Sequence, residues 1–158
     1  MARILVDVRR VVLVSCIIAL LAVSMPTAYG TRGESSAWSQ TSSYPLSVYL
    51  HDCVIESSLI YCVGGYNGTT DVDSVYHAQI ASGGIGVWTQ TTSYPVPIDS
   101  ERCVTDSGYI YCIGGGQNGA FSDLVYYTQL SQAGISSWSL TTSYPIKAWG
   151  TGCACMSP

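Results

Sequence analysis

The sequence has few charged residues and very little positive charge. Lys, Arg, Asp and Glu make up 10% of the 158 residues, and six bases against ten acids give a formal net charge of −4. Binding to nucleic acid requires a basic stripe that neutralises phosphates, so this class of partner is excluded. Because 47% of the residues are hydrophobic, a highly charged disordered chain is excluded as well.

The chain also has few Lys, Glu and Leu residues after its first thirty residues, and it lacks common catalytic motifs. One Phe stands against 12 Tyr and 16 Gly, a composition that suits a turn-rich β protein. No Gly-x-Ser-x-Gly, no HExxH and no phosphate-binding glycine loop occurs. We therefore expect an all-β protein that needs no cofactor.

Residues 1–30 have the pattern of a secretory signal peptide. Three arginines precede the apolar run Val11–Met25, and Ala28-Tyr29-Gly30 places small residues at the two positions that a signal peptidase reads. We expect cleavage before Thr31. The alternative is an uncleaved membrane-anchor helix, although this run is short for a span that needs roughly 20 residues. Both interpretations place residues 31–155 in an extracellular or cell-surface location.

A repeat of fifty residues organises the rest of the chain. Its anchors are Trp38, Trp88 and Trp138, the Tyr-Pro pairs that begin at Tyr44, Tyr94 and Tyr144, and the stretch LIYCVGG at 59–65, which returns as YIYCIGG at 109–115. β-Branched and aromatic residues followed by two glycines predict a strand that ends in a forced turn. A period near 50 in which Trp, Tyr-Pro and Gly-Gly recur at fixed positions indicates a propeller array.

The order of a hydrophobic strand, Gly-Gly, a Tyr and then a Trp resembles the kelch repeat. The resemblance covers about residues 38–153, with longer turns than usual at 82–86 and 132–136. It implies two four-stranded propeller blades, about 46–92 and 96–142, and a partial blade at 146–155. Single strands are expected to flank the blades at 37–42 and 147–155.

The eight strands expected in the two blades can be bounded from the sequence. They are about 47–55, 59–64, 74–80 and 87–91 in the first blade and 97–105, 109–114, 124–130 and 137–141 in the second. A propeller closes with typically four to eight blades, so two blades form an incomplete propeller. We expect a truncated form of a longer protein, or self-association that covers the open faces. A remnant without function is a third interpretation.

The seven cysteines suggest disulfides, because export places them in an oxidising compartment. Two-residue turns at 57–58 and 107–108 would set Cys53 opposite Cys62, and Cys103 opposite Cys112, at positions where side chains come closest. We predict a disulfide across each hairpin. Zinc is the alternative, but its ligand pairs usually sit two to four residues apart and no such cluster is evident, so no metal is expected.

The two copies differ where each inner strand begins, and in kelch-like propellers the loops there rim the central channel. The candidate ligand-binding residues are Tyr49, His51, Asp52, Asp99, Glu101, Arg102 and Trp149. Their mixture of aromatic, acidic and basic side chains suits a polar partner. Solvated loop ends are the alternative.

These observations predict a secreted or cell-surface binding module without catalysis that recognises a protein or a glycan. The alternative is a fragment of an extracellular enzyme that resembles galactose oxidase. The copper site of such an enzyme needs two His, a Tyr and a Tyr-Cys crosslink, but the repeat register places His77 on an outer strand, away from the channel.

Four acids are candidates for glycoside hydrolysis, but no spacing fixes a catalytic pair. These acids are Asp71, Asp73, Asp99 and Glu101. Asn67 is a candidate glycosylation site on an exposed turn.

Overall fold

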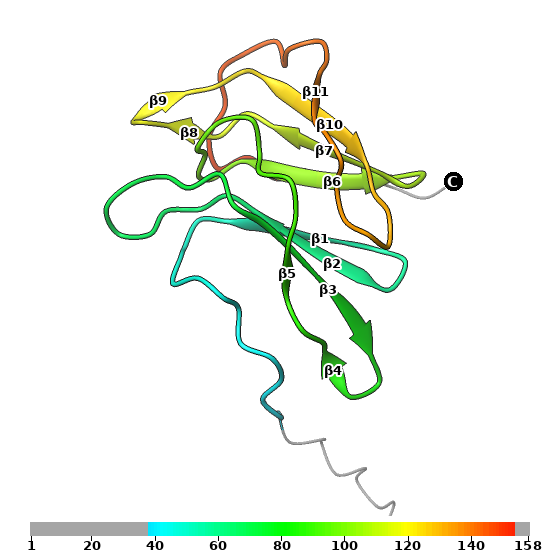
Figure 1. Cartoon of the computed structure of the whole chain (residues 1–158). Helices are drawn as coiled ribbons and strands as arrows, with labels where there is room; N and C mark the ends of the chain where they lie inside the picture. Colours follow the sequence, from blue (N-terminus) through cyan, green and yellow to red (C-terminus); the bar gives the residue numbers. More distant parts are fainter. Residues whose placement is uncertain (1–37, 154–158) are drawn as a thin grey trace, which may run out of the picture. The chain divides into compact units, whose positions relative to one another are not determined.

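The computed structural model describes residues 38–153, and these residues form an all-β protein of antiparallel sheets, none of them closed (Figure 1). The first sheet contains β1 (Asp52–Glu56), β2 (Leu59–Val63), β3 (Val75–Ala81), β4 (Gly84–Ile85) and β5 (Thr89–Gln90). The second contains β6 (Arg102–Asp106), β7 (Tyr109–Ile113), β10 (Val125–Gln129) and β11 (Ser139–Leu140). A small hairpin joins β8 (Gly116–Gln117) to β9 (Ala120–Phe121).

Each of the two large sheets repeats the same strand order. In the first, β2 lies between β1 and β3, and β5 pairs with β3; in the second, β7 lies between β6 and β10, and β11 pairs with β10. No helix within residues 38–153 has the length and apolarity to cross a bilayer. The expected signal or anchor segment, residues 1–30, lies outside the described residues.

The register of both inner hairpins matches the sequence prediction. Cys53 lies opposite Cys62, and Cys103 lies opposite Cys112. Their Cα atoms are 4.1 Å and 4.0 Å apart, and each pair forms a disulfide, so both predicted disulfides are confirmed. Such short loops give a disulfide an entropic stabilisation of about 2–3 kcal/mol at most.

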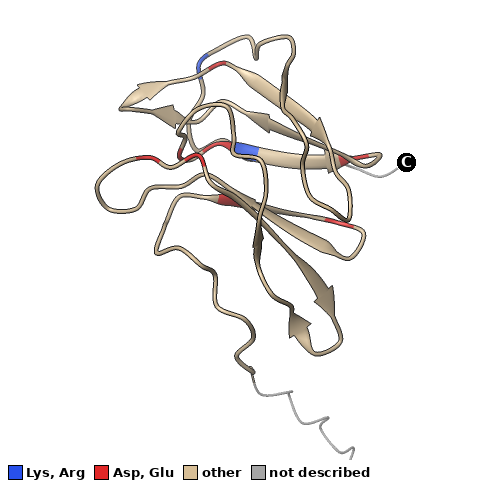
Figure 2. Cartoon of the chain, in the orientation of Figure 1, with Lys and Arg blue, Asp and Glu red and all other residues tan. Residues whose placement is uncertain are grey.

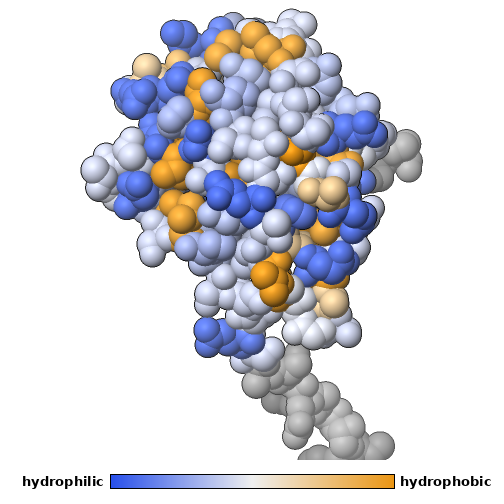
Figure 3. All heavy atoms as spheres, viewed as in Figure 1, coloured by the Kyte–Doolittle hydropathy of each residue, from blue (hydrophilic) through white to orange (hydrophobic). Residues whose placement is uncertain are grey.

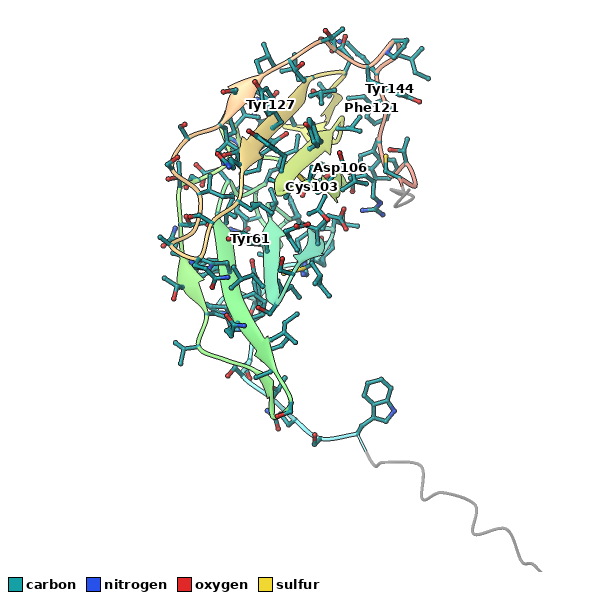
Figure 4. The ribbon with its side chains drawn as sticks, turned by 90° about the vertical axis from the view of Figure 1, so that its right-hand side faces the viewer. Tyr61, Cys103, Asp106, Phe121, Tyr127 and Tyr144 are labelled. Atoms are coloured by element: carbon teal, nitrogen blue, oxygen red, sulfur yellow. A yellow bond between two sulfur atoms is a disulfide. The ribbon has the colours of Figure 1, made fainter. Side chains whose placement is uncertain are left out.

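The two sheets share a core in which Tyr61 is a central residue. The side chains of Tyr61, Val63, Val75, Ile98 and Ile110 are buried together. Tyr61 also joins the sheets directly, because its hydroxyl donates a hydrogen bond of 2.6 Å to the carbonyl oxygen of Ser131. Figure 4 places this side chain between the first sheet and the loops of the second.

The repeated Trp and Tyr residues pack as the repeat predicts in two of three copies. Trp88 meets the edge of Tyr44 at a ring distance of 5.0 Å, and Trp138 meets Tyr94 at 4.9 Å. Trp38 is fully exposed. Within residues 38–153 the packing role therefore holds for Trp88 and Trp138 and not for Trp38.

Two predictions about strand extent were wrong. Both inner strands begin about five residues later than expected, at Asp52 and Arg102, because the preceding residues make only single bridges. The flanking single strands are not formed at 38–42 or 147–153. Thr41 instead bonds Ile85 through its side chain, and Ala148 bridges Ser122, so each segment lacks the continuous backbone ladder of a strand.

The surface of the sheets is mixed in polarity. On the face in Figure 3, apolar residues form small separate groups among polar ones. Such scattered exposure is normal for a folded protein and identifies no docking surface on that face.

The structure predicts unequal effects of adding one methyl group at Gly64 and at Gly108. Both residues have positive φ, 62° and 80°, but a Cβ at Gly64 would lie 2.6 Å from the Ile98 carbonyl oxygen, while one at Gly108 would meet nothing within 4 Å. Both substitutions by Ala incur the left-handed backbone cost of about 1–2 kcal/mol. Gly64→Ala adds an overpacking cost of about 1–3 kcal/mol.

Urea unfolding of the two variants measures the difference. We expect Gly64→Ala to lose clearly more free energy of unfolding than Gly108→Ala. Equal losses would show that the close approach of Ile98 to Gly64 does not exist in solution.

Candidate ligand-binding cleft

A cleft of about 400 Å³ opens where loops of the two sheets meet. It is lined by Tyr66, Thr69, Thr70, Asp71, Asp99, Asn118 and Gly119. The lining comes from three segments: the loop after β2, the segment that leads into β6, and the β8–β9 turn. This volume falls within the range of small-molecule sites, and the lining is rich in hydrogen-bonding groups.

Backbone bonds fix the loops on both sides of the cleft. Tyr49 and Tyr66 exchange a pair of backbone hydrogen bonds of 3.0 and 2.7 Å, and Asp99 and Gly116 exchange an equivalent pair of 3.0 and 2.7 Å. The side-chain oxygen of Asn67 accepts the amides of two following residues and closes the outer turn. The cleft walls are therefore held by main-chain geometry.

Two acids face each other across the cleft. Oδ2 of Asp71 accepts a 2.8 Å hydrogen bond from the amide of Asn118, which ties the first loop to the β8–β9 turn. Burial raises the pKa of Asp71, the Asn118 amide opposes the shift, and the nearby carboxylate of Asp99 raises the pKa further. Both acids line the same cleft.

Exposed aromatic rings lie beside these acids. Trp149 donates a 3.2 Å hydrogen bond from Nε1 to Oδ1 of Asp99, and its ring stacks on Phe121 at 5.9 Å with an angle of 18° between the planes. Tyr49 packs edge-on against Tyr66 at 5.4 Å. Tyr49, Trp149 and Phe121 are each 53–55% exposed, so their rings remain available to a ligand.

The remaining candidate residues lie elsewhere and hold the sheets together. Asp52 accepts the amide of Cys103 at 2.7 Å, which joins β1 to β6, and Arg102 lies 4.0 Å from the same carboxylate. A partly exposed ion pair at this distance contributes little stability. Figure 2 shows that acidic segments gather near the start of β6, where Arg102 lies.

His51 and Glu101 occupy equivalent positions in the two repeats but different environments. His51 is half-buried and stacks on Tyr44 at 5.3 Å. Glu101 is fully buried, and neither of its carboxylate oxygens has a hydrogen-bond partner. Burial raises the pKa of Glu101 to about 8; the backbone amides of Glu101 and Asp52 oppose the shift without reaching hydrogen-bond geometry. Glu101 does not contact the cleft as an exposed ligand-binding residue would.

A second hollow, of about 240 Å³, lies at the turn ends of the two inner hairpins. It is lined by Glu56, Ser57, Leu59, Tyr61, Gly108, Leu130, Ser131 and Gln132. The Tyr61 hydroxyl is already bonded to Ser131, so this hollow offers fewer free polar groups than the cleft. We therefore treat the cleft as the candidate site.

Sequence reasoning found part of this site and missed part of it. Tyr49, Asp99 and Trp149 were predicted as ligand-binding residues, and the structure brings all three to the cleft or its rim. Asp71 was named only among the acids considered for glycoside hydrolysis, and Phe121 was missed, because both lie after the inner strands and outside the positions that were compared for ligand binding. The dipeptide Asn118-Gly119 favours a tight turn, and it could have indicated the β8–β9 hairpin whose first residue, Gly116, pairs with Asp99.

Comparisons with known proteins bear on the fold alone. No family model and no curated protein matches this chain. Among solved structures, the chain is similar to the structure of YjhT, with a TM-score of 0.56 and 18% sequence identity over 67% of this chain. The match covers 31% of that protein, so this chain spans about a third of its length. At this identity the likeness supports the all-β architecture and carries no function.

The buried Glu101 predicts a stability that falls as the pH rises. Its folded pKa of about 8 lies above its ordinary value of 4.5, so the folded state loses free energy of unfolding as the pH rises from about 4.5 to about 8. Glu101→Gln should therefore be more stable than the wild type at pH 9 by a few kcal/mol, at about 1.4 kcal/mol per pKa unit, with little or no advantage at pH 4.

Urea unfolding at both pH values checks this prediction. The exposed Asp106→Asn serves as the control and should change little at either pH. A Glu101→Gln variant with no gain at pH 9 would contradict the burial of an unpartnered carboxylate.

Proposed function

We propose that this chain is a pair of kelch-type propeller blades from a secreted or cell-surface binding module, and that the module binds glycans at the cleft without catalysis. The observation that carries the proposal is the arrangement at the cleft: exposed aromatic rings stand beside a pair of carboxylates that the backbone holds in place.

The chemistry of the cleft suits a carbohydrate. The apolar faces of a sugar ring stack on exposed aromatic side chains, as Trp149 and Tyr49 offer, because both surfaces leave water together. Sugar hydroxyls donate hydrogen bonds to carboxylates, and bonds to charged acceptors are the stronger kind. Asp71 and Asp99 supply those acceptors, whereas an apolar peptide would leave them unpaired.

The partners of the two acids favour binding over hydrolysis. A glycosidase needs one carboxyl group that protonates the leaving oxygen and a second that attacks the sugar or activates a water. Asp71 instead accepts the amide of Asn118, and Asp99 accepts Nε1 of Trp149, so each carboxylate is already held by a neighbouring loop residue. We therefore assign this pair to recognition.

The copper-oxidase alternative receives less support. The two histidines stack on different tyrosines, His51 on Tyr44 and His77 on Tyr61. His77 lies in the core, paired with Tyr61 across β2 and β3. We propose a non-catalytic module on these grounds.

Two features support the blade assignment and the location. The strand order of one large sheet repeats in the other, and the same backbone bonds recur fifty residues later; Gly65 donates to Ile98 and Gly115 to Ala148. The two disulfides are the form that cysteines take in an oxidising, extracellular environment.

Binding of the exported protein to an array of neutral and acidic oligosaccharides tests the proposal. We expect at least one oligosaccharide to bind, and Trp149→Ala and Asp99→Asn each to weaken it about tenfold, which corresponds to about 1.4 kcal/mol. Trp38→Ala and Asp106→Asn, an exposed Trp and an exposed Asp outside the cleft, are the matched controls.

The controls should bind as the wild type does. If no oligosaccharide binds, or if the control variants lose as much affinity as the cleft variants, the assignment of the cleft to glycans is wrong.

A further inference from the structure

His51 and the Cys53–Cys62 disulfide form a cluster that the glycan proposal does not use. A ring nitrogen of His51 and the two sulfur atoms all lie within 4.8 Å of one another. Nδ1 of His51 is buried and has no hydrogen-bond partner. Within residues 38–153, no other three His, Cys, Asp or Glu side chains come together in this way.

The surrounding structure holds these three side chains in place independently of the sulfur–sulfur bond. Five consecutive residue pairs join β1 to β2 and keep the Cα atoms of the two cysteines 4.1 Å apart. The imidazole stacks flat on Tyr44, with 8° between the rings. The close approach of Gly65 fixes the base of the His51 side chain, because a Cβ there would lie 2.9 Å from Cβ of His51.

We propose that reduction of the Cys53–Cys62 disulfide converts this cluster into a zinc site in which His51, Cys53 and Cys62 are the protein ligands and water fills the fourth position. Two thiolates and one imidazole are ligands that Zn²⁺ prefers, and this set resembles three-ligand zinc sites in chemistry. The site goes beyond the proposed function and does not depend on it.

The disulfide becomes a zinc site in two steps, reduction and then metal binding. A dithiol reductant gives two electrons and two protons to the protein disulfide and is itself oxidised to a disulfide, which leaves two protein thiols. Zn²⁺ then binds both sulfurs and displaces the two thiol protons into solvent. A divalent ion, two thiolates and a neutral imidazole have no net charge, so the half-buried position carries little desolvation cost.

Solvent can reach the cluster, because His51 is only half-buried. Cys53 is exposed, so both a reductant and a metal ion can reach the cluster. A free ring nitrogen next to an accessible disulfide is the arrangement that the proposal requires.

The second repeat provides a matched comparison inside the same chain. Cys103 and Cys112 have the same register and a Cα separation of 4.0 Å, but Glu101 stands where the first repeat has His51. No group of three ligands is formed there. A site that needs the histidine should therefore bind one metal ion per chain, and a site that needs only two paired thiols should bind two.

Cobalt titration of the reduced protein tests the proposal. The full chain, with Cys16, Cys153 and Cys155 replaced by Ser, is reduced with dithiothreitol, desalted without oxygen and titrated with Co²⁺, whose thiolate absorption bands report the ligands. We expect one equivalent of Co²⁺ per chain, displaced by Zn²⁺, and no binding before reduction.

Two variants separate a histidine ligand from thiols alone. His51→Ala should weaken Co²⁺ binding by more than the roughly tenfold loss that follows removal of a supporting residue. Glu101→Gln should bind as the unsubstituted chain does. Two equivalents per chain, equal affinity in His51→Ala, or no thiolate bands after reduction would each overturn the proposal, whatever the oligosaccharide array shows.

Discussion

A closed set of three backbone hydrogen bonds joins the first sheet to the second, and the rest of the structure depends on it. Gly65 donates to the carbonyl oxygen of Ile98, Ile98 donates to Val72, and Val72 donates back to Gly65, at 2.8–3.1 Å. The same set recurs fifty residues later among Gly115, Ala148 and Ser122. Because Ile98 lies against Gly64, a side chain at this glycine would separate the strand from the segment that opens the next sheet.

The cleft is a consequence of these bonds. They bring the loop after β2 beside the segment that leads into β6, so Asp71 and Asp99 line the same cleft although they are 28 positions apart in the sequence. The loop that follows Gly65 holds Tyr66, and the segment that follows Ile98 holds Asp99, so the positions that line the cleft are next to the positions that join the sheets. The repeat keeps the glycines constant and lets these neighbours differ.

The fifty-residue repeat predicted strand order, both disulfides and three cleft residues, because register within a hairpin follows from local spacing. It could not predict that Glu101 is fully buried, since His51 at the equivalent position is only half-buried. It also could not place Asp71 beside Asp99 or His51 beside a disulfide, because contacts across sheets depend on how the sheets stack. The prediction of the flanking strands was wrong for the same reason. A segment becomes a strand only where a neighbouring segment supplies a continuous ladder of backbone hydrogen bonds.

Amide hydrogen exchange at Gly65, Val72 and Ile98 tests most directly whether the backbone set couples the sheets. If it does, these amides exchange with the same opening free energy as those at the centres of β2 and β7, since the sheets then open together. Exchange at these three amides that is much faster than in β2 and β7 would contradict the account, because the sheets would then be separate units that touch without holding one another.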